Sequence, residues 1–312
     1  MITPSSSAAI IGGGTMGADI ALLFAVAGWQ THILETSDTA RADLPDRLKN
    51  GLSRMGGPDN ALNRLHSHTA MKNLPWPQIE IVVECVPENL ALKRQVFHEL
   101  ESYSSPDTIL TSNSSSFPIS QIGGGLKNPA RIAGLHFFMP AHLVPVVEVV
   151  RCETTDPALP EKLDKLMRSL GKLPVQVRRD IPGFLANRIQ HALMREALAL
   201  VEDGIASVED VDIAVRFGFG FRFLGAGPLL QKDLSGLDIH YNAAATIYPH
   251  LCNDSAPSKV LGERVRAGKL GVKSGEGFYA WTKEKSAQAK ADYDALLSAG
   301  LKLLRKEITK AT

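Results

Sequence analysis

The chain has 312 residues, of which 44% are apolar and 21% are charged, and its formal net charge is +1. This near balance of charge provides no basic surface for nucleic acid or for an anionic membrane, so we expect a small-molecule partner. A length of this order is typical of two domains.

The N-terminal residues and the cysteines bear on the compartment. Residues 1–9 contain no Lys or Arg, and the apolar run that follows soon breaks into glycines, a pattern unlike a secretory signal. No run approaches the ~20 apolar residues of a membrane span. Cys85, Cys152 and Cys252 are far apart in the chain and have no metal-ligand spacing. We therefore expect a cytoplasmic protein without a metal site.

Residues 8–35 predict a βαβ unit. An apolar run at 8–11 is followed by glycines, a helical pattern at 18–27, a stop at Gly28 and a second apolar run at 31–34. Residues 36–73 are polar with leucines at helical spacing, and they predict a helical arm that is interrupted at Gly56-Gly57-Pro58.

Strands and helices then alternate as far as residue 177. Strands are expected at residues 79–83, 108–111, 131–138, 146–150 and 173–177, and helices at 90–103 and 159–170. This order predicts an α/β domain of the doubly wound, Rossmann type.

Strand-like runs cease at Asp180, and helical patterns take over. We place a domain boundary at Asp180-Ile181-Pro182-Gly183, which gives a dinucleotide-binding domain at 1–180 and a smaller all-α domain at 181–312. The helical domain begins with an amphipathic helix at 184–201, has a capping signal at Ser207, and ends with a terminal helix in the last thirty residues.

The glycines after the first strand fit a dinucleotide fingerprint. Gly12-Gly13-Gly14-Thr15-Met16-Gly17 provides Gly12 for a tight turn, Gly14 for close approach to a pyrophosphate and Gly17 for helix packing. The helix that starts at this motif would point its free N–H groups, including those of Thr15 and Met16, at the phosphates.

An acidic residue ends the second predicted strand. Glu35 is about where a ribose-binding acid is expected, and its charge would repel a 2′-phosphate, so the sequence favours NAD over NADP. Arg41 is close enough in the sequence to keep NADP as an alternative.

A histidine and a glutamate lie in consecutive strand-like runs. If the runs at 131–138 and 146–150 pair antiparallel about a loop centred on His142, His136 and Glu148 lie opposite each other. A carboxylate beside an imidazole is the arrangement of an oriented general base. A core histidine next to an unrelated glutamate is the alternative.

Several segments together resemble the 3-hydroxyacyl-CoA dehydrogenase family over nearly the whole chain. In order they are Val82-Val83-Glu84 with Glu88-Asn89-Leu90 and Lys93, Ser112-Asn113-Ser114-Ser115, Gly134-Leu135-His136-Phe137-Phe138, Pro182-Gly183-Phe184 with Asn187-Arg188, and Gly271 to Tyr279. The resemblance implies an NAD-binding domain, a helical domain that commonly forms a homodimer, and a substrate pocket between the two.

The resemblance also implies roles for single residues. His136 would accept the proton of a substrate hydroxyl while hydride passes to NAD, and Glu148 would orient the imidazole. Ser115 would bond the substrate oxygen, and Asn187 would hold the substrate from the second domain. In the family, three further positions contact the nicotinamide half of the cofactor. The residues at these positions here are Glu88, Lys93 and Asn113.

The same residues have structural alternatives. Ser115 and Asn113 would serve equally to cap the turn after a strand. Asn187 would also suit a hydrogen bond between helices, and Glu88 would suit the cap of a helix that begins near Asn89.

Two departures from the family bear on the substrate. The third residue after His136 is usually asparagine in the members that handle CoA, and here it is Met139, a soft apolar side chain. The arm between Glu35 and Ile79 also looks shorter than the arm that helps to carry CoA in those members. Both departures put CoA binding in doubt.

A third feature points to a free acid. The segment Phe217-Gly218-Phe219-Gly220-Phe221-Arg222-Phe223 resembles that of family relatives that oxidise free hydroxy acids or carnitine. The guanidinium of Arg222 suits a carboxylate, because its fork binds both oxygens. A structural ion pair with Asp233 is the alternative. Further candidates for the pocket rim are Lys232, Asp233 and His240.

The sequence as a whole predicts an NAD-dependent dehydrogenase that acts on the CH–OH group of a small free hydroxy acid or, through its hydrate, of an aldehyde acid. A short-chain 3-hydroxyacyl-CoA, such as 3-hydroxybutyryl-CoA, is the alternative substrate. A non-catalytic NAD-binding protein is the alternative of another class.

Overall fold

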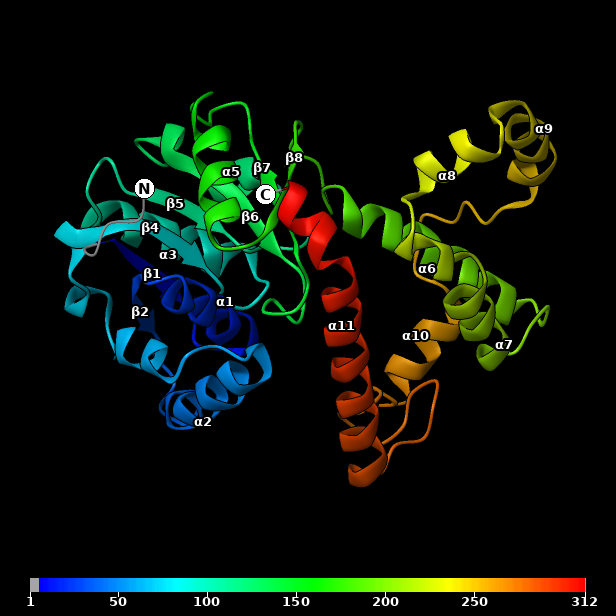
Figure 1. The fold of residues 1–312 in the computed structure, drawn as a ribbon, viewed down its shortest axis with the longest axis horizontal. Coiled ribbons are helices and arrows are strands. Elements are labelled where there is room, and N and C mark those ends of the chain that lie inside the picture. The colour runs from blue at the N-terminus through cyan, green and yellow to red at the C-terminus, as the bar shows by residue number, and fades with distance from the viewer. Residues whose placement is uncertain (1–5, 312) are drawn as a thin grey trace. The chain divides into compact units, whose positions relative to one another are not determined.

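The computed structural model describes residues 6–311. The chain divides into two compact units, one formed by Met1–Asn187 with Arg305–Thr312 and the other by Arg188–Leu304 (Figure 1). Asn187 thus belongs to the first unit. The boundary expected at residues 180 and 181 stays a prediction.

The first unit is built on one eight-stranded sheet with the order β3-β2-β1-β4-β5-β6-β7-β8. The strands are β1 Ser7–Ile11, β2 Gln30–Leu34, β3 Leu65–His68, β4 Ile79–Glu84, β5 Ile109–Ser112, β6 Ile132–Phe137, β7 Val146–Val150 and β8 Leu173–Val177. Strands β1 to β6 are parallel, β7 pairs antiparallel with β6, and β8 pairs parallel with β7. The order of the first six strands is that of the doubly wound dinucleotide-binding fold.

Helices cover both faces of this sheet. One core packs α1 (Thr15–Val26), α2 (Asp38–Met55) and α5 (Leu159–Ser169) on the sheet. The core on the other face packs α3 (Leu90–Tyr103) and α4 (Ile119–Ile122). Strands that are buried on both faces consist mostly of apolar residues, and for this reason the apolar runs in the sequence predicted them. The predicted α/β fold class is confirmed.

The arm between β2 and β4 differs from the prediction of a helical segment. Helix α2 ends at Gly56, whose φ is 63°, so the interruption at Gly56-Gly57-Pro58 is confirmed. Beyond a 3₁₀ turn at Asp59–Arg64, however, Leu65–His68 forms strand β3 at the edge of the sheet. A short edge strand with polar side chains has no apolar alternation, so its pairing with β2 decides its conformation.

The rest of the chain is helical. No named strand follows β8 in the described residues, as expected. The helices are α6 Ala186–Glu202, α7 Val208–Ile213, α8 Pro228–Ser235, α9 Leu237–Ile247, α10 Lys259–Arg266 and α11 Lys283–Ala311. The Ser207 side chain accepts a hydrogen bond from Asp210 N and caps α7, which confirms that signal. The aromatic segment forms a π-helical turn at Ala214–Phe219 and a 3₁₀ turn at Phe221–Leu224.

Within residues 6–311 no single helix is long and apolar enough to cross a membrane. A pair of helical segments, Val208–Leu224 and Pro228–Ser235, passes the same test of length and composition only when taken together, with a bend of 81° between them.

Candidate active site

The glycine loop lies between β1 and α1, where the strand order reverses. Gly12 has a φ of 106°, and a Cβ there would lie 2.8 Å from Cys85 O; a Cβ on Gly17 would lie 1.8 Å from Gly12 O. These two positions therefore require glycine. A Cβ on Gly14 would meet nothing within 4 Å, so open space lies beside the uncapped N-terminus of α1, which begins with Thr15 and Met16. This loop and helix end fit a pyrophosphate.

Glu35 follows β2 beside that loop. Its carboxylate accepts hydrogen bonds from Gly13 N at 2.8 Å and Ser37 N at 2.9 Å, so two backbone groups hold it in place. Arg41 donates to Glu35 O and forms an ion pair with Asp38. Because the charge of Arg41 is already matched by an acid, and Glu35 and Asp38 both repel phosphate, this end of the site fits NAD better than NADP.

His136 and Glu148 face each other across the antiparallel pair β6 and β7. The register joins the two residues directly, which confirms the predicted pairing, and His136 Nδ1 lies 2.6 Å from Glu148 Oε2. Both side chains are buried, with 3% and 0% exposed. A buried carboxylate at this distance is a charge-assisted acceptor for Nδ1–H, so the other ring nitrogen, Nε2, is the one free to accept a proton.

The second carboxylate oxygen of Glu148 is held by the backbone before α6. Glu148 Oε1 accepts hydrogen bonds from Leu185 N at 3.0 Å and Ala186 N at 2.8 Å. The preceding residue, Phe184, has a φ of 49°, which is strained for a non-glycine residue. The Phe184 ring is buried and lies 5.9 Å from the His136 ring, between ring centroids. Packing at Phe184 thus maintains the backbone geometry that orients Glu148.

Ser115 lies on the opposite side of the imidazole. Its Oγ is 3.0 Å from His136 Nε2, and its carbonyl oxygen accepts a hydrogen bond from Asn187 Nδ2 at 3.1 Å. The structure therefore brings together four residues that the sequence singled out, namely His136, Glu148, Ser115 and Asn187. Asn187 belongs to the same compact unit as the other three.

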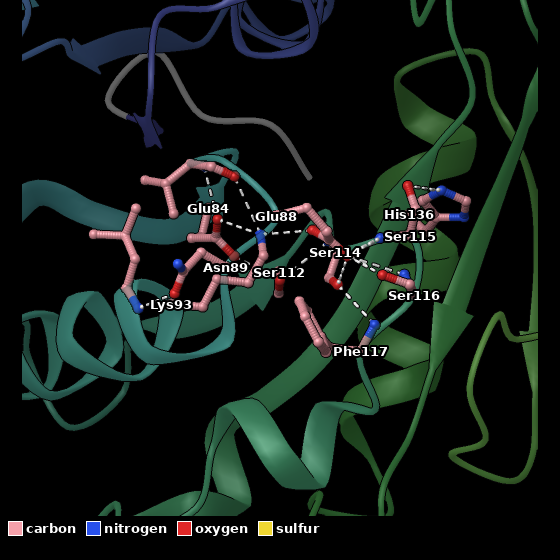
Figure 2. Close-up of polar contacts among 12 residues, drawn as sticks. Glu84, Glu88, Asn89, Lys93, Ser112, Ser114, Ser115, Ser116, Phe117 and His136 are labelled. Atoms are coloured by element: carbon pink, nitrogen blue, oxygen red, sulfur yellow. Dashed lines mark hydrogen bonds and ion pairs between the residues drawn. The ribbon is translucent and has the colours of Figure 1, made fainter. Parts of the chain in front are cut away.

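Glu88 and Lys93 lie beside this group (Figure 2). Glu88 Oε1 accepts hydrogen bonds from the turn after β5, through Ser114 Oγ, Ser115 N and both Ser116 N and Ser116 Oγ, at 2.6–3.2 Å. Burial by itself would raise the pKa of Glu88, but these hydrogen bonds and the charge of Lys93 outweigh it and lower the pKa to about 2. Glu88 is thus ionised throughout the neutral range, and it caps this turn rather than the helix at Asn89.

Asn89 itself caps α3, because its side chain accepts from Leu92 N at 3.0 Å. Asn113 joins β5 to β6, since its Oδ1 accepts from Phe137 N at 2.8 Å. This bond fixes the end of β6 one residue after His136.

The candidates Arg222, Asp233 and His240 belong to the second compact unit. Arg222 is exposed in the 3₁₀ turn Phe221–Leu224, and the described part of the chain contains no ion pair between Arg222 and Asp233. His240 Nε2 lies 2.7 Å from Ser235 Oγ. Arg222 thus keeps an unpaired guanidinium in the described structure, as a carboxylate-binding residue requires.

Three residues that the structure ties to the site have no role that the sequence predicted. Glu84 is wholly buried and bonds Lys93 and Ser112, while Ser114 and Ser116 bond Glu88. A carboxylate directly after the apolar run Ile81–Val83 was the available signal, because a charge is buried only where partners neutralise it.

Comparison with known proteins identifies a family. The model of the 3-hydroxyacyl-CoA dehydrogenase NAD-binding domain matches residues 7–181, and the model of the 3-hydroxyacyl-CoA dehydrogenase C-terminal domain matches residues 183–281.

Individual relatives align over most of the chain. Over 304 residues it is 33% identical to 5-formyl-3-hydroxy-2-methylpyridine 4-carboxylate 5-dehydrogenase of Mesorhizobium japonicum, covering 95% of this chain and 97% of that protein. Over 297 residues it is 35% identical to 3-hydroxyadipyl-CoA dehydrogenase of Escherichia coli, covering 92% of this chain but 61% of that longer protein. A crystal structure of the pyridine-carboxylate dehydrogenase, described as an NAD⁺-dependent dismutase, matches with a TM-score of 0.90 at 31% identity, covering 97% of this chain and 98% of that one.

Proposed function

The chain belongs to the 3-hydroxyacyl-CoA dehydrogenase family and is an NAD-dependent oxidoreductase, and we propose that it oxidises a small free hydroxy acid or aldehyde acid with His136 as the general base. The observation that carries the chemistry is the position of His136 Nε2, which is 3.0 Å from Ser115 Oγ while Nδ1 is paired with Glu148. A neutral imidazole held in this tautomer accepts a proton at Nε2.

The mechanism follows from the contacts of each side chain. Ser115 Oγ binds the substrate oxygen, and His136 Nε2 takes the hydroxyl proton as the C–H bond breaks. Glu148 stabilises the resulting imidazolium, and the backbone N–H groups of Leu185 and Ala186 keep its carboxylate in place. Asn187 supports Ser115 through the carbonyl oxygen. When bound, NAD would accept the hydride from the substrate carbon.

The same site performs the oxidation of an aldehyde. The hydrate of an aldehyde is a carbinol, so its hydroxyl proton passes to His136 Nε2 as its hydride leaves, and the product is a carboxylic acid. In the opposite direction, the protonated His136 returns the proton to a carbonyl oxygen. The geometry of Ser115, His136 and Glu148 serves both substrates without rearrangement.

Cofactor binding is proposed for the residues at the carboxyl ends of β1, β2, β4 and β5. The turn that would receive the pyrophosphate is formed by Gly12, Gly14, Thr15, Met16 and Gly17, and Glu35 would bind the ribose hydroxyls. The nicotinamide half would lie toward Glu88, Lys93 and Asn113.

A substrate without CoA is supported by the loop after β6 and by the relatives. Met139, which replaces the asparagine usual in CoA-handling members, is 67% exposed and offers an apolar surface three residues after His136. The dehydrogenase of Mesorhizobium japonicum, which aligns over 97% of its length, is named for a small pyridine carboxylate that bears a formyl group. The exposed guanidinium of Arg222 suits such a carboxylate.

A short-chain 3-hydroxyacyl-CoA is the second candidate, since the relative from Escherichia coli is a 3-hydroxyadipyl-CoA dehydrogenase. A screen for NADH formation across free acids, aldehyde acids and CoA thioesters separates the two, with His136→Ala as the blank. NADH formation that is specific to CoA thioesters would overturn the free-acid proposal. Binding of NAD without turnover of any compound would instead indicate a non-catalytic protein.

Replacing Arg222 by methionine tests the carboxylate site. We expect KM for a free acid to rise roughly 10- to 100-fold, because a charge-assisted hydrogen bond contributes about 1.5–3 kcal/mol. Arg216→Met is the matched control, since Arg216 lies in the same aromatic segment and stacks on Phe217. An unchanged KM in Arg222→Met removes this residue from the pocket.

The helical unit supports a homodimer. Helices α7, α8, α9 and α10 have no buried residue, and large apolar side chains are exposed there, including Leu229 at 81%, Leu234 at 76% and Tyr241 at 76%. So much exposed apolar surface is typical of an interface, and we propose that a second copy covers it.

Sedimentation equilibrium checks this proposal. We expect twice the mass of one chain at micromolar concentration, with dissociation on replacing Leu229 and Leu234 together by glutamate. The mass of a single chain in the unaltered protein would contradict the homodimer.

A further inference from the structure

Glu84 is a buried acid at the carboxyl end of β4. None of its side chain is exposed, and its carboxylate receives three hydrogen bonds: Val86 N at 2.7 Å and Lys93 Nζ at 2.9 Å on Oε1, and Ser112 Oγ at 2.6 Å on Oε2. Burial raises the pKa of Glu84, while the charge of Lys93 and these hydrogen bonds oppose the rise. The carboxylate is thus satisfied entirely by neighbours within the fold.

Lys93 lies between two carboxylates (Figure 2). Its side chain is 1% exposed, and Nζ contacts Glu84 Oε1 at 2.9 Å, Val86 O at 3.2 Å and Glu88 Oε2 at 3.2 Å. An ammonium group has three N–H donors, so these contacts occupy all of them. Lys93 therefore acts on the site through the orientation of Glu88.

Glu88, oriented by Lys93, in turn binds the turn after β5. With Oε2 held by Lys93, Oε1 receives the hydrogen bonds of residues 114–116. A second route reaches the same turn, because Ser112 Oγ, which donates to Glu84, accepts from Ser114 N at 3.1 Å. Both routes lead from Glu84 to the backbone of the turn that carries Ser115.

Stability is a weak reason for this arrangement. A buried ion pair adds little to the free energy of unfolding compared with apolar side chains of the same shape, because desolvation offsets the attraction. An ion pair does, however, restrict its members to a narrow range of positions, and the turn it fixes holds Ser115 Oγ 3.0 Å from His136 Nε2. A displacement of about 1 Å at such a contact lowers turnover by up to ~10²-fold.

We propose that Glu84 is a positioning residue that sets the contact between Ser115 and His136, through Lys93 and Glu88 on one route and through Ser112 on the other. This inference rests on the proposed function, in which Ser115 and His136 bind the reacting oxygen and its proton. Glu84 itself touches neither substrate nor cofactor.

Glu84→Gln tests the proposal with little change of shape. The glutamine oxygen must accept from Val86 N, so its amide group faces Ser112 Oγ, whose proton loses its acceptor, and Lys93 loses one of its two counter-charges. We expect kcat to fall about 10- to 100-fold with little change in KM. The matched control is Glu80→Gln, an exposed glutamate on the same strand, which should leave kcat unchanged.

Further variants separate positioning from simple loss of stability. Ser112→Ala interrupts only the second route and should lower kcat by a smaller factor. The double variant, Glu84→Gln with Lys93→Met, should lower kcat by less than the product of the two single-variant factors, since both residues act on Glu88. Urea unfolding of each variant measures its free energy of unfolding, which is compared with its kcat. A kcat equal to that of the unaltered enzyme in Glu84→Gln, even with lowered stability, would overturn the proposal, as would losses that simply multiply.

A crystal structure of Glu84→Gln keeps this test separate from the proposed function. We expect the Ser115 Oγ to His136 Nε2 separation to lengthen or the turn at 114–116 to show several conformations. An unaltered turn would overturn the inference whatever the substrate. If the unaltered protein oxidises no candidate compound, the proposed function fails, and the geometry of the variant alone decides whether Glu84 positions the turn.

Discussion

Replacing His136 by alanine is expected to lower kcat/KM by about 10²–10⁴-fold, the range that a general base contributes, while NAD still binds. The buried imidazole is the group at this site whose Nε2 faces Ser115 Oγ, at 3.0 Å, with its Nδ1 held by Glu148. Without the imidazole, no group among the described residues is in position to accept the proton of the substrate hydroxyl while hydride leaves the carbon.

NADH absorbance measures turnover, and titration of protein fluorescence with NAD measures binding of the cofactor. His98→Ala is the matched control, because His98 is an exposed histidine on α3 and its loss should leave kcat/KM unchanged. Turnover of His136→Ala close to that of the unaltered enzyme would remove His136 from the mechanism.

Replacing Glu148 by glutamine should abolish most activity through the tautomer of the imidazole. The N–H groups of Leu185 and Ala186 both donate to Glu148 Oε1, so the glutamine must place its carbonyl oxygen there. Its amide group then donates to His136 Nδ1, which forces the proton onto Nε2. An Nε2 that already carries a proton cannot act as a base, and we expect kcat to fall by roughly 10²–10⁴-fold.

The imidazole ¹⁵N chemical shifts of His136 report this change directly, since they distinguish a protonated Nδ1 from a protonated Nε2. Glu153→Gln, an exposed glutamate in the loop after β7, is the control for the loss of a negative charge. If Glu148→Gln keeps the same tautomer as the unaltered protein and still loses activity, Glu148 stabilises the imidazolium by charge alone. Full activity would contradict its role altogether.

The parts of the fold that the sequence predicted well are those that depend on local pattern and on burial. Strands β1 and β6 are buried along their whole length and are mostly apolar, and β4 contains the apolar run Ile81–Val83, so all three were recognised. Gly12 and Gly17 have no room for a side chain, and that constraint is visible as a motif. The pairing of His136 with Glu148 was predictable because register in an antiparallel pair follows from the length of the loop.

The parts that were missed depend on partners far away in the chain. Strand β3 is a short polar segment, and it is extended because β2 offers an unpaired edge. The role of Glu84 follows from Ser112, 28 positions later, and from its own complete burial. The contacts of Lys93 with Glu84 and Glu88 were also not visible in the sequence, and its contact with the cofactor stays a prediction.

The sequence by itself determined the family, the cofactor and the alternation of strands and helices, and it singled out His136, Glu148, Ser115 and Asn187, which the structure brings together. It did so because glycine turns, apolar periodicity and short motifs are local properties of a chain. The tertiary structure alone decided which hydrogen bonds those residues make. Whether a carboxylate such as Glu84 or Glu88 binds a ligand or orients a turn depends on the donors that surround it in three dimensions, and these come from strands and loops that are distant in sequence.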